Sequence, residues 1–182
     1  MHVTIRRSIC NALISAFDSH KSRINPKGIF NLKQPDLKLL TDQCMSKSSI
    51  ISETIRKSNT AVTLQTTLQH FDDLSDCICK AADLMEFLRH CGPLKLEAAI
   101  QHSRLNRLVN ELNTDQQLYS KLVHANKCKD LSGTDKLLCR SLLTDFQQSG
   151  IHLEQGGRDK FIQLQDKLNV AIVKIHEWMS LD

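Results

Sequence analysis

The sequence contains few of the residues that interrupt a regular backbone. Its 182 residues include six glycines and three prolines, and aromatic residues make up 4% of the chain. Gly and Pro mark the tight turns of many-stranded proteins, and β-branched runs are also few, so the composition argues against a sandwich of short strands. With 41% hydrophobic residues, the chain can bury a sizeable core as one domain or as part of a larger one. We therefore predict an all-α fold of antiparallel helical hairpins packed into a bundle.

The chain also lacks a strong charge of either sign and a long apolar run. The formal net charge is +4, from 24 basic and 20 acidic residues, and like charges are not gathered into blocks. Nucleic-acid-binding surfaces are usually strongly basic and clustered, so we expect no nucleic-acid partner. No stretch approaches the run of about 18 apolar residues that crosses a bilayer, so we expect no membrane span.

Cysteine is not scarce, but its number is odd. Seven cysteines occur in a mid-sized chain in which we recognise no secretory signal, and this argues against a disulfide framework. We predict free thiols in a reducing compartment. The seven are Cys10, Cys44, Cys77, Cys79, Cys91, Cys128 and Cys139.

The first 24 residues have a composition of their own. They are rich in Ser and contain four basic residues against one acid, namely Arg6, Arg7, Lys21, Arg23 and Asp18. A helix would place four apolar side chains on one face: Ile5, Ile9, Leu13 and Phe17. This pattern is typical of a mitochondrial transit peptide, although an ordinary amphipathic helix or a frayed terminus fits it too. We interpret residues 1–24 as the transit peptide and residues 25–35, with their Pro and Gly, as a linker.

Helical spacing of apolar residues continues through residues 36–182. Asp36 is a candidate N-cap for a first helix, whose expected apolar face is Leu37, Leu40, Cys44, Ile51 and Ile55. A second helix is predicted to begin between residues 63 and 70 and to stop at Gly92-Pro93, because Pro cannot continue the hydrogen bonds. Its predicted buried stripe is Phe71, Leu74, Ile78, Ala81, Ala82, Met85 and Leu88. The short connection to a return helix predicts an antiparallel hairpin.

Three further helices are predicted in the second half of the chain. One begins at Asn113-Thr114-Asp115, whose side-chain oxygens can accept from the first amides of a helix. The next is capped by Thr134 and ends at Gly150. The last opens within residues 154–158, and its expected buried stripe is Phe161, Leu164, Leu168, Ile172 and Ile175.

No group of residues carries a recognisable catalytic pattern. His176-Glu177 would begin the zinc motif H-E-x-x-H, but the position of the second histidine is Ser180. Two imidazoles one helical turn apart are needed to converge on one ion, so we regard this pair as a coincidence of composition.

Cysteine and histidine elsewhere also fall short of a metal site. Cys77 and Cys79 are two positions apart on a helix, which points their thiols about 200° apart and excludes a shared tetrahedral ion, even with His90 and Cys91 nearby. Acids near a helix start, here Asp72, Asp73 and Asp76, complement the helix dipole. The remaining histidines without a ligand partner at suitable spacing are His70, His102, His124 and His152. We assign no catalytic, cofactor-binding or metal-binding residue.

Two segments resemble the amino-terminal part of the thimet-oligopeptidase family of zinc metallopeptidases. They are FDDLSDCICKAADLMEFLRHC at residues 71–91 and LLTDFQQSGIHLEQGGRDKFIQLQDKL at residues 142–168, and VNELNTDQQLYSKL at residues 109–122 adds to the likeness. The most specific elements are Asp145-Phe146, the link from Ser149 to Leu153, and Arg158, because a helix, a Gly stop, an apolar link and a new helix follow in that order. Within the family, the likeness is strongest to mitochondrial members.

The resemblance implies a helical wall of a clam-shell peptidase with a deep channel for short unfolded peptides. Its mitochondrial members process imported precursor proteins in the matrix, and such peptides or unfolded precursors would be the partners of the intact enzyme. The family carries its zinc ligands and catalytic Glu in a carboxyl-terminal half that has no counterpart here. We therefore expect a truncated, M3-like chain without a cofactor of its own, inactive in isolation. The other readings are a non-catalytic helical peptide-binding or interaction protein and an unrelated helical scaffold.

Overall fold

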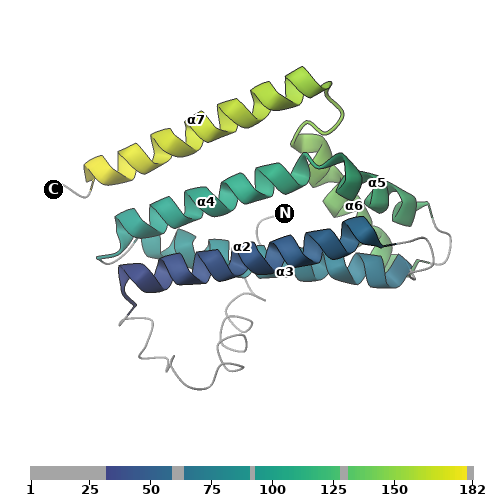
Figure 1. Ribbon diagram of the computed structural model, residues 1–182, viewed down its shortest axis with the longest axis horizontal. Coiled ribbons are helices and arrows are strands. Elements are labelled where there is room, and N and C mark those ends of the chain that lie inside the picture. The colour runs from purple at the N-terminus through teal and green to yellow at the C-terminus, as the bar shows by residue number, and fades with distance from the viewer. Residues whose placement is uncertain (1–31, 59–63, 91–92, 128–130, 180–182) are drawn as a thin grey trace.

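The computed structural model describes residues 32–58, 64–90, 93–127 and 131–179, and this part of the chain is all-α, as predicted. It contains the helices α2 (Gln34–Lys57), α3 (Leu64–His90), α4 (Lys95–Asn113), α5 (Gln116–Asn126), α6 (Gly133–Gln148) and α7 (Gln155–Met179). The long helices α2, α3 and α4 lie side by side, α5 and α6 cross one end, and α7 runs along the outer side of α4 (Figure 1). The predicted transit peptide lies outside the described residues.

Helix α2 begins before the predicted N-cap. Its first residue is Gln34, so Asp36 lies in the first turn, where its carboxylate accepts from the backbone N–H of Lys33 at 2.9 Å. Pro35 explains the difference, because the missing N–H of a proline is harmless in the first turn of a helix. The buried face includes Leu37, Cys44 and Ile55, which belong to the predicted apolar face.

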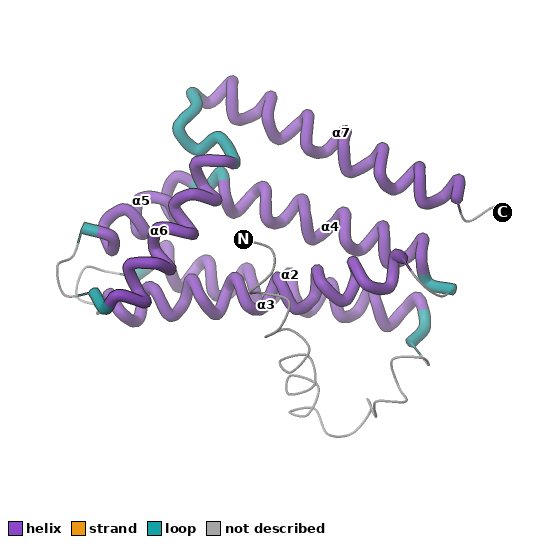
Figure 2. The backbone as a smooth tube through the Cα atoms, turned by 180° about the vertical axis from the view of Figure 1, so that it is seen from behind, coloured by secondary structure: helices purple, strands orange, loops and turns teal. Residues whose placement is uncertain are grey.

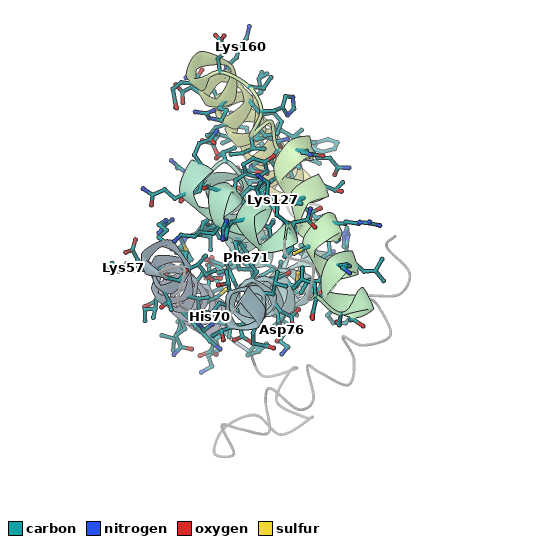
Figure 3. All side chains as sticks on the ribbon, turned by 90° about the vertical axis from the view of Figure 1, so that its right-hand side faces the viewer. Lys57, His70, Phe71, Asp76, Lys127 and Lys160 are labelled. Carbon is teal, nitrogen blue, oxygen red and sulfur yellow. The ribbon has the colours of Figure 1, made fainter. Side chains whose placement is uncertain are left out.

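Helix α3 supplies the central part of the core. Its buried side chains recur every three or four residues and face α2 on one side and α4 on the other: Leu68, Phe71, Leu74, Ile78, Ala81, Leu84, Met85 and Leu88. In the end-on view of Figure 3, Phe71 points into the bundle, whereas His70 and Asp76 lie on its outer side. Helix α4 returns beside α3, so the predicted antiparallel hairpin is confirmed (Figure 2).

The N-caps of the shorter helices match the predictions in one case and correct them in the other. Asp115 caps α5, and its Oδ1 accepts from Gln117 N at 2.8 Å and Leu118 N at 3.1 Å. Helix α6 is capped by Ser132, whose Oγ accepts from Asp135 N at 3.1 Å, and the prediction of Thr134 is wrong. Ser132 and Thr134 both carry a hydroxyl group that can cap a helix. The structure uses the earlier one, Ser132, so the helix begins at Gly133.

Ion pairs join helices that are distant in sequence. Arg56 in α2 donates to Asp115 Oδ2 through Nε at 2.9 Å and Nη2 at 2.7 Å, and the two side chains are 24% and 17% exposed. Arg104 in α4 reaches Asp42 in α2 at 2.7 Å. The Arg56 pair is the more important, since its carboxylate also caps α5 and sets where that helix starts.

The stripe predicted for α7 is wrong in part. Leu164, Leu168 and Ile175 are more than half exposed, at 56%, 54% and 56%. The face toward α4 is shifted and includes Phe161 and Ile172 with the buried Asn169. Helix α7 carries apolar residues on two sides, and α4 covers one of them. Among the described helices, none is long and apolar enough to cross a membrane.

The central role of α3 makes its most deeply buried side chain the best test of the fold. Met85 is 0% exposed, so we expect Met85→Ala to lower the free energy of unfolding by about 2–4 kcal/mol through lost contacts and a cavity. Ile50→Ala on α2, where the side chain is 65% exposed, should cost less than about 0.5 kcal/mol. Urea unfolding followed by circular dichroism measures both, and equal losses would contradict the arrangement of the core.

Candidate functional site

A groove of about 570 Å³ opens where α3, α4, α6 and α7 meet. Its apolar lining comes from all of these helices and from the first turn of α5: Phe71, Leu74, Ile78, Val109, Leu112, Leu118, Leu142, Phe146 and Phe161. Tyr119 of α5 packs against Phe146, with 5.7 Å between the ring centroids. The groove is the size of a binding site for a few side chains of a peptide.

The two segments that carry the resemblance meet in this groove. Phe71, Leu74 and Ile78 come from the first segment, and Leu142, Phe146 and Phe161 come from the second. The resemblance therefore falls on one structural feature. Helix α3 forms it together with α6 and α7, although the two segments are some 70 residues apart in the sequence.

Polar groups of the groove are mostly amides. Asn110, Asn113, Gln148 and Gln165 lie in its lining, and amide side chains can donate to and accept from a peptide backbone. The one carboxylate in the lining is that of Asp145, and burial raises its pKa above the usual range for an aspartate. This arrangement suits the binding of an extended, partly apolar peptide better than the binding of a strongly charged ligand.

The thiol in the groove is not an activated nucleophile. Cys79 lines the groove near Ser75, and burial raises its pKa, so the protonated thiol dominates at neutral pH. The one carboxylate of the lining, Asp145, adds to this effect, because its negative charge also raises the pKa of Cys79. The apolar and amide side chains of the lining can bind and orient a ligand.

The turn between α6 and α7 fixes one wall of the groove. Gly150 has φ of 79°, and the amides of Gly150 and Ile151 donate to the carbonyls of Gln147 and Phe146, both at 3.1 Å. This pair of bonds is the Schellman motif that closes a helix and reverses the chain. Gln116 of α5 donates to Ile151 O at 3.0 Å, which ties the turn to the start of α5. The predicted stop at Gly150 is confirmed.

Arg158, the other specific element of the resemblance, supports the same turn. Its Nη1 donates to Leu153 O and its Nη2 to Gln155 Oε1, both at 2.6 Å. These bonds hold the link from Gly150 to α7 in place. A second, smaller pocket of about 460 Å³ lies beside Arg158, between the start of α7 and the turn from α4 to α5. Arg158 thus has a structural role in the turn and lines the smaller pocket.

The structure keeps apart the residues that were considered as metal ligands. Cys77 faces Cys44 on α2, whereas Cys79 points to the groove, and His90 pairs with Glu86 on its own helix at 3.1 Å. The described residues hold no group of three His, Cys, Asp or Glu side chains that could bind an ion. The side chain of His176 and the residue Cys91 lie outside what the structure describes.

Two interactions that link helices were not anticipated from the sequence. Arg56 and Asp115 are 59 positions apart, and Cys44 and Cys77 are 33 positions apart. Cys44 was placed on the apolar face of its helix, but Cys77 lies outside the predicted stripe of α3, so periodicity carried no signal for the pair. The prediction of free thiols is confirmed for the four described cysteines Cys44, Cys77, Cys79 and Cys139.

The described helices form a bundle with an apolar groove of about 570 Å³ between α3, α4, α6 and α7. Comparison with known proteins shows which proteins this chain is similar to. Over 162 residues the chain is 34% identical to mitochondrial intermediate peptidase of Vanderwaltozyma polyspora, which covers 83% of this chain and 21% of the relative. The chain is also 33% identical to mitochondrial intermediate peptidase 2 of Cryptococcus neoformans over 159 residues. This match covers 80% of this chain and 19% of the relative.

A third relative extends the match further along the chain. Mitochondrial intermediate peptidase of Saccharomyces cerevisiae is 28% identical over 176 residues, or 87% of this chain and 23% of the relative. The predicted resemblance to mitochondrial intermediate peptidases is therefore confirmed, and the chain spans about a fifth of the length of these relatives. No protein-family model matches the chain, and no solved structure matches it.

Because the turn at Gly150 sets the course of α7, its glycine should be sensitive to substitution. A Cβ at position 150 would lie 2.9 Å from Leu153 Cδ1 on a backbone with positive φ. We expect Gly150→Ala to lower the free energy of unfolding by about 1–2 kcal/mol. Gly156→Ala, in open space in the first turn of α7, should raise it by a few tenths of a kcal/mol, up to about 1. Thermal melts of the two variants test this, and a neutral Gly150→Ala would contradict it.

Proposed function

We propose that this chain is the amino-terminal helical region of a zinc metalloendopeptidase like mitochondrial intermediate peptidase, and that it binds substrate peptide without hydrolysing it. The observation that carries the proposal is the groove between α3, α4, α6 and α7, which is built from the two segments of the resemblance. Its apolar floor and amide rim fit an extended peptide. In the intact enzyme this surface would form part of the channel wall.

Zinc is the cofactor that the resemblance implies, but the residues described here do not fit it. They contain no set of three ligand side chains, and the sequence lacks a second histidine after His176-Glu177. Zinc chemistry would have to be supplied by residues of the intact enzyme that have no counterpart in these 182. We propose that the isolated chain is inactive for this reason.

The outer side of α7 supports a place within a larger assembly. Four exposed apolar side chains follow one another at helical spacing, namely Leu164, Leu168, Ile175 and Trp178, and Trp178 is 71% exposed. A contiguous exposed apolar stripe usually marks a contact surface. In a protein with the length of the relatives, the remaining four-fifths would cover this stripe.

The location proposed for the protein is the mitochondrial matrix. The relatives are mitochondrial intermediate peptidases by name, and the basic, Ser-rich first 24 residues are typical of a transit peptide. We further propose that the substrates of the intact enzyme are imported precursor proteins, because a groove of about 570 Å³ accommodates a few side chains of an unfolded segment.

A second candidate function is a non-catalytic peptide-binding protein. The groove favours it, since helices of this chain alone form a hollow large enough for a few side chains of a peptide. The two candidates differ in one respect. A stand-alone binder should hold peptides with useful affinity by itself, whereas one wall of a channel should hold them only weakly.

The exposed stripe predicts self-association of the isolated chain. We expect the wild type to form dimers or larger species at micromolar concentrations, and Leu164→Lys with Leu168→Lys to shift it toward monomer by roughly tenfold in dissociation constant. Leu39→Lys with Ile50→Lys is the control, because these side chains on α2 are equally exposed but lie away from α7. Sedimentation velocity makes the comparison, and a wild type that stays monomeric would refute the idea.

The functional proposal is tested with an unstructured octapeptide that carries a fluorophore and two apolar side chains. With zinc added, the purified chain should leave the peptide intact, and chelator-sensitive cleavage would overturn the proposal. Fluorescence anisotropy of the same mixture should show weak binding, with a dissociation constant above about 100 µM, that falls at least fivefold in Leu142→Gln and less than twofold in Leu143→Gln. Leu142 lines the groove, and its half-buried neighbour Leu143 does not. Binding below about 1 µM would instead favour the second candidate.

A further inference from the structure

A pair of thiols joins α2 to α3 at a point away from the groove. Cys77 Sγ donates to Cys44 Sγ at 3.9 Å, and the Cys44 thiol donates to the main-chain carbonyl of Cys77 at 3.5 Å. Cys44 is 6% exposed, and Cys77 is half-buried. The two thiols thus face each other across a helix interface, with one of them reachable from solvent.

The surroundings make the two sulfur atoms unequal. The hydrogen bond with the Cys44 thiol lowers the pKa of Cys77 to about 6, and the positive charge of Lys47 acts in the same direction. The pKa of Cys44 is raised by the same hydrogen bond and by burial. When Cys77 loses its proton, the Cys44 thiol can turn and donate to the thiolate. One member is therefore a nucleophile at neutral pH, and the other is a protonated partner held against it.

We propose that Cys44 and Cys77 form a reversible disulfide between α2 and α3 on exposure to a peroxide. The two sulfur atoms must approach from 3.9 Å to about 2.05 Å, a movement within reach of side-chain rotation on helices already in contact. The inference does not depend on the proposed function, because the pair lies outside the groove lining.

The chemistry proceeds in two balanced steps. The Cys77 thiolate attacks one oxygen of hydrogen peroxide, the O–O bond breaks, and Cys77 becomes a sulfenic acid while the hydroxide released takes up a proton to give water. The Cys44 sulfur then attacks the Cys77 sulfur, the S–OH bond breaks, and the Cys44 proton leaves with that hydroxyl as a second water. Overall, two thiols lose two electrons and two protons, and one peroxide gives two waters. A thiol reductant reverses the change.

The other described cysteines provide internal comparisons. Cys79 is two positions from Cys77 on the same helix but points to the groove, and Cys139 is 0% exposed on α6. Their pKa values are raised by burial, so neither is activated in the way that Cys77 is. A cross-link that forms at Cys77 and not at Cys79 therefore tests both the position of the Cys77 thiol beside Cys44 and its lowered pKa.

The experiment uses two variants of the full chain with two cysteines each. The first keeps Cys44 and Cys77 and the second keeps Cys44 and Cys79, with the other five cysteines replaced by Ser. After treatment with hydrogen peroxide at pH 7, free thiols are alkylated, and tryptic peptides are mapped without reduction. We expect the first variant to lose two hydrogens and to join peptide 39–47 to peptide 58–80 at least tenfold faster than the second. Dithiothreitol should reverse the cross-link, and denaturant should abolish the difference.

Circular dichroism tests whether both variants are folded. The wild type and its Cys79→Ser variant are mapped in parallel, so that the cross-link is also measured if the five Ser substitutions prevent folding. Oxidation of the first variant should raise its melting temperature by about 5–10 °C, because the cross-link closes a chain segment of 33 positions. Equal rates in the two variants would overturn the proposal. So would a Cys77 that is oxidised to sulfinic acid while Cys44 can still be alkylated.

Discussion

The buried stripe of α3 is the constraint on which the other helices depend. Phe71 to Leu88 present apolar side chains on two adjoining faces, and α2 and α4 pack against them. A helix of 27 residues with few aromatic side chains fills such a core with Leu, Met and Ala, which lets its neighbours lie close. Once this three-helix layer exists, α5 and α6 can close one end, and the floor of the groove is made of the same residues that stabilise the fold.

Helix α7 is placed differently, and the site depends on that difference. It packs on α4 and is anchored by the Schellman turn at Gly150, the bond from Gln116 and the bonds of Arg158. Because a single helix covers it, α7 completes the groove with Phe161 while its opposite side keeps Leu168 and Trp178 in solvent. The same helix thus forms a wall of the groove and carries an exposed apolar stripe on its opposite side.

Much of the fold could be predicted because helical periodicity and caps are local signals. The extent of α3, the return of α4, the cap at Asp115 and the stop at Gly150 all followed from residues within a few positions of one another. The buried stripe of α7 could not be predicted, because apolar residues lie on two sides of the helix and the sequence does not indicate which side packs against α4. The groove was also beyond reach, because residues near 71, 112, 146 and 161 share it only after packing, and Cys77 lies outside every predicted stripe.

The central claim is that these helices are the wall of a peptidase like mitochondrial intermediate peptidase. A chimera tests it most directly, in which residues 32–179 replace the matching segment of the Saccharomyces cerevisiae enzyme. The measurement is the rate at which the purified, folded chimera cleaves an octapeptide substrate of that enzyme. We expect chelator-sensitive cleavage within about a hundredfold of the parent, with Leu142→Gln raising KM and Leu143→Gln leaving it unchanged. A chimera that is folded and binds zinc but cleaves no peptide would contradict the account.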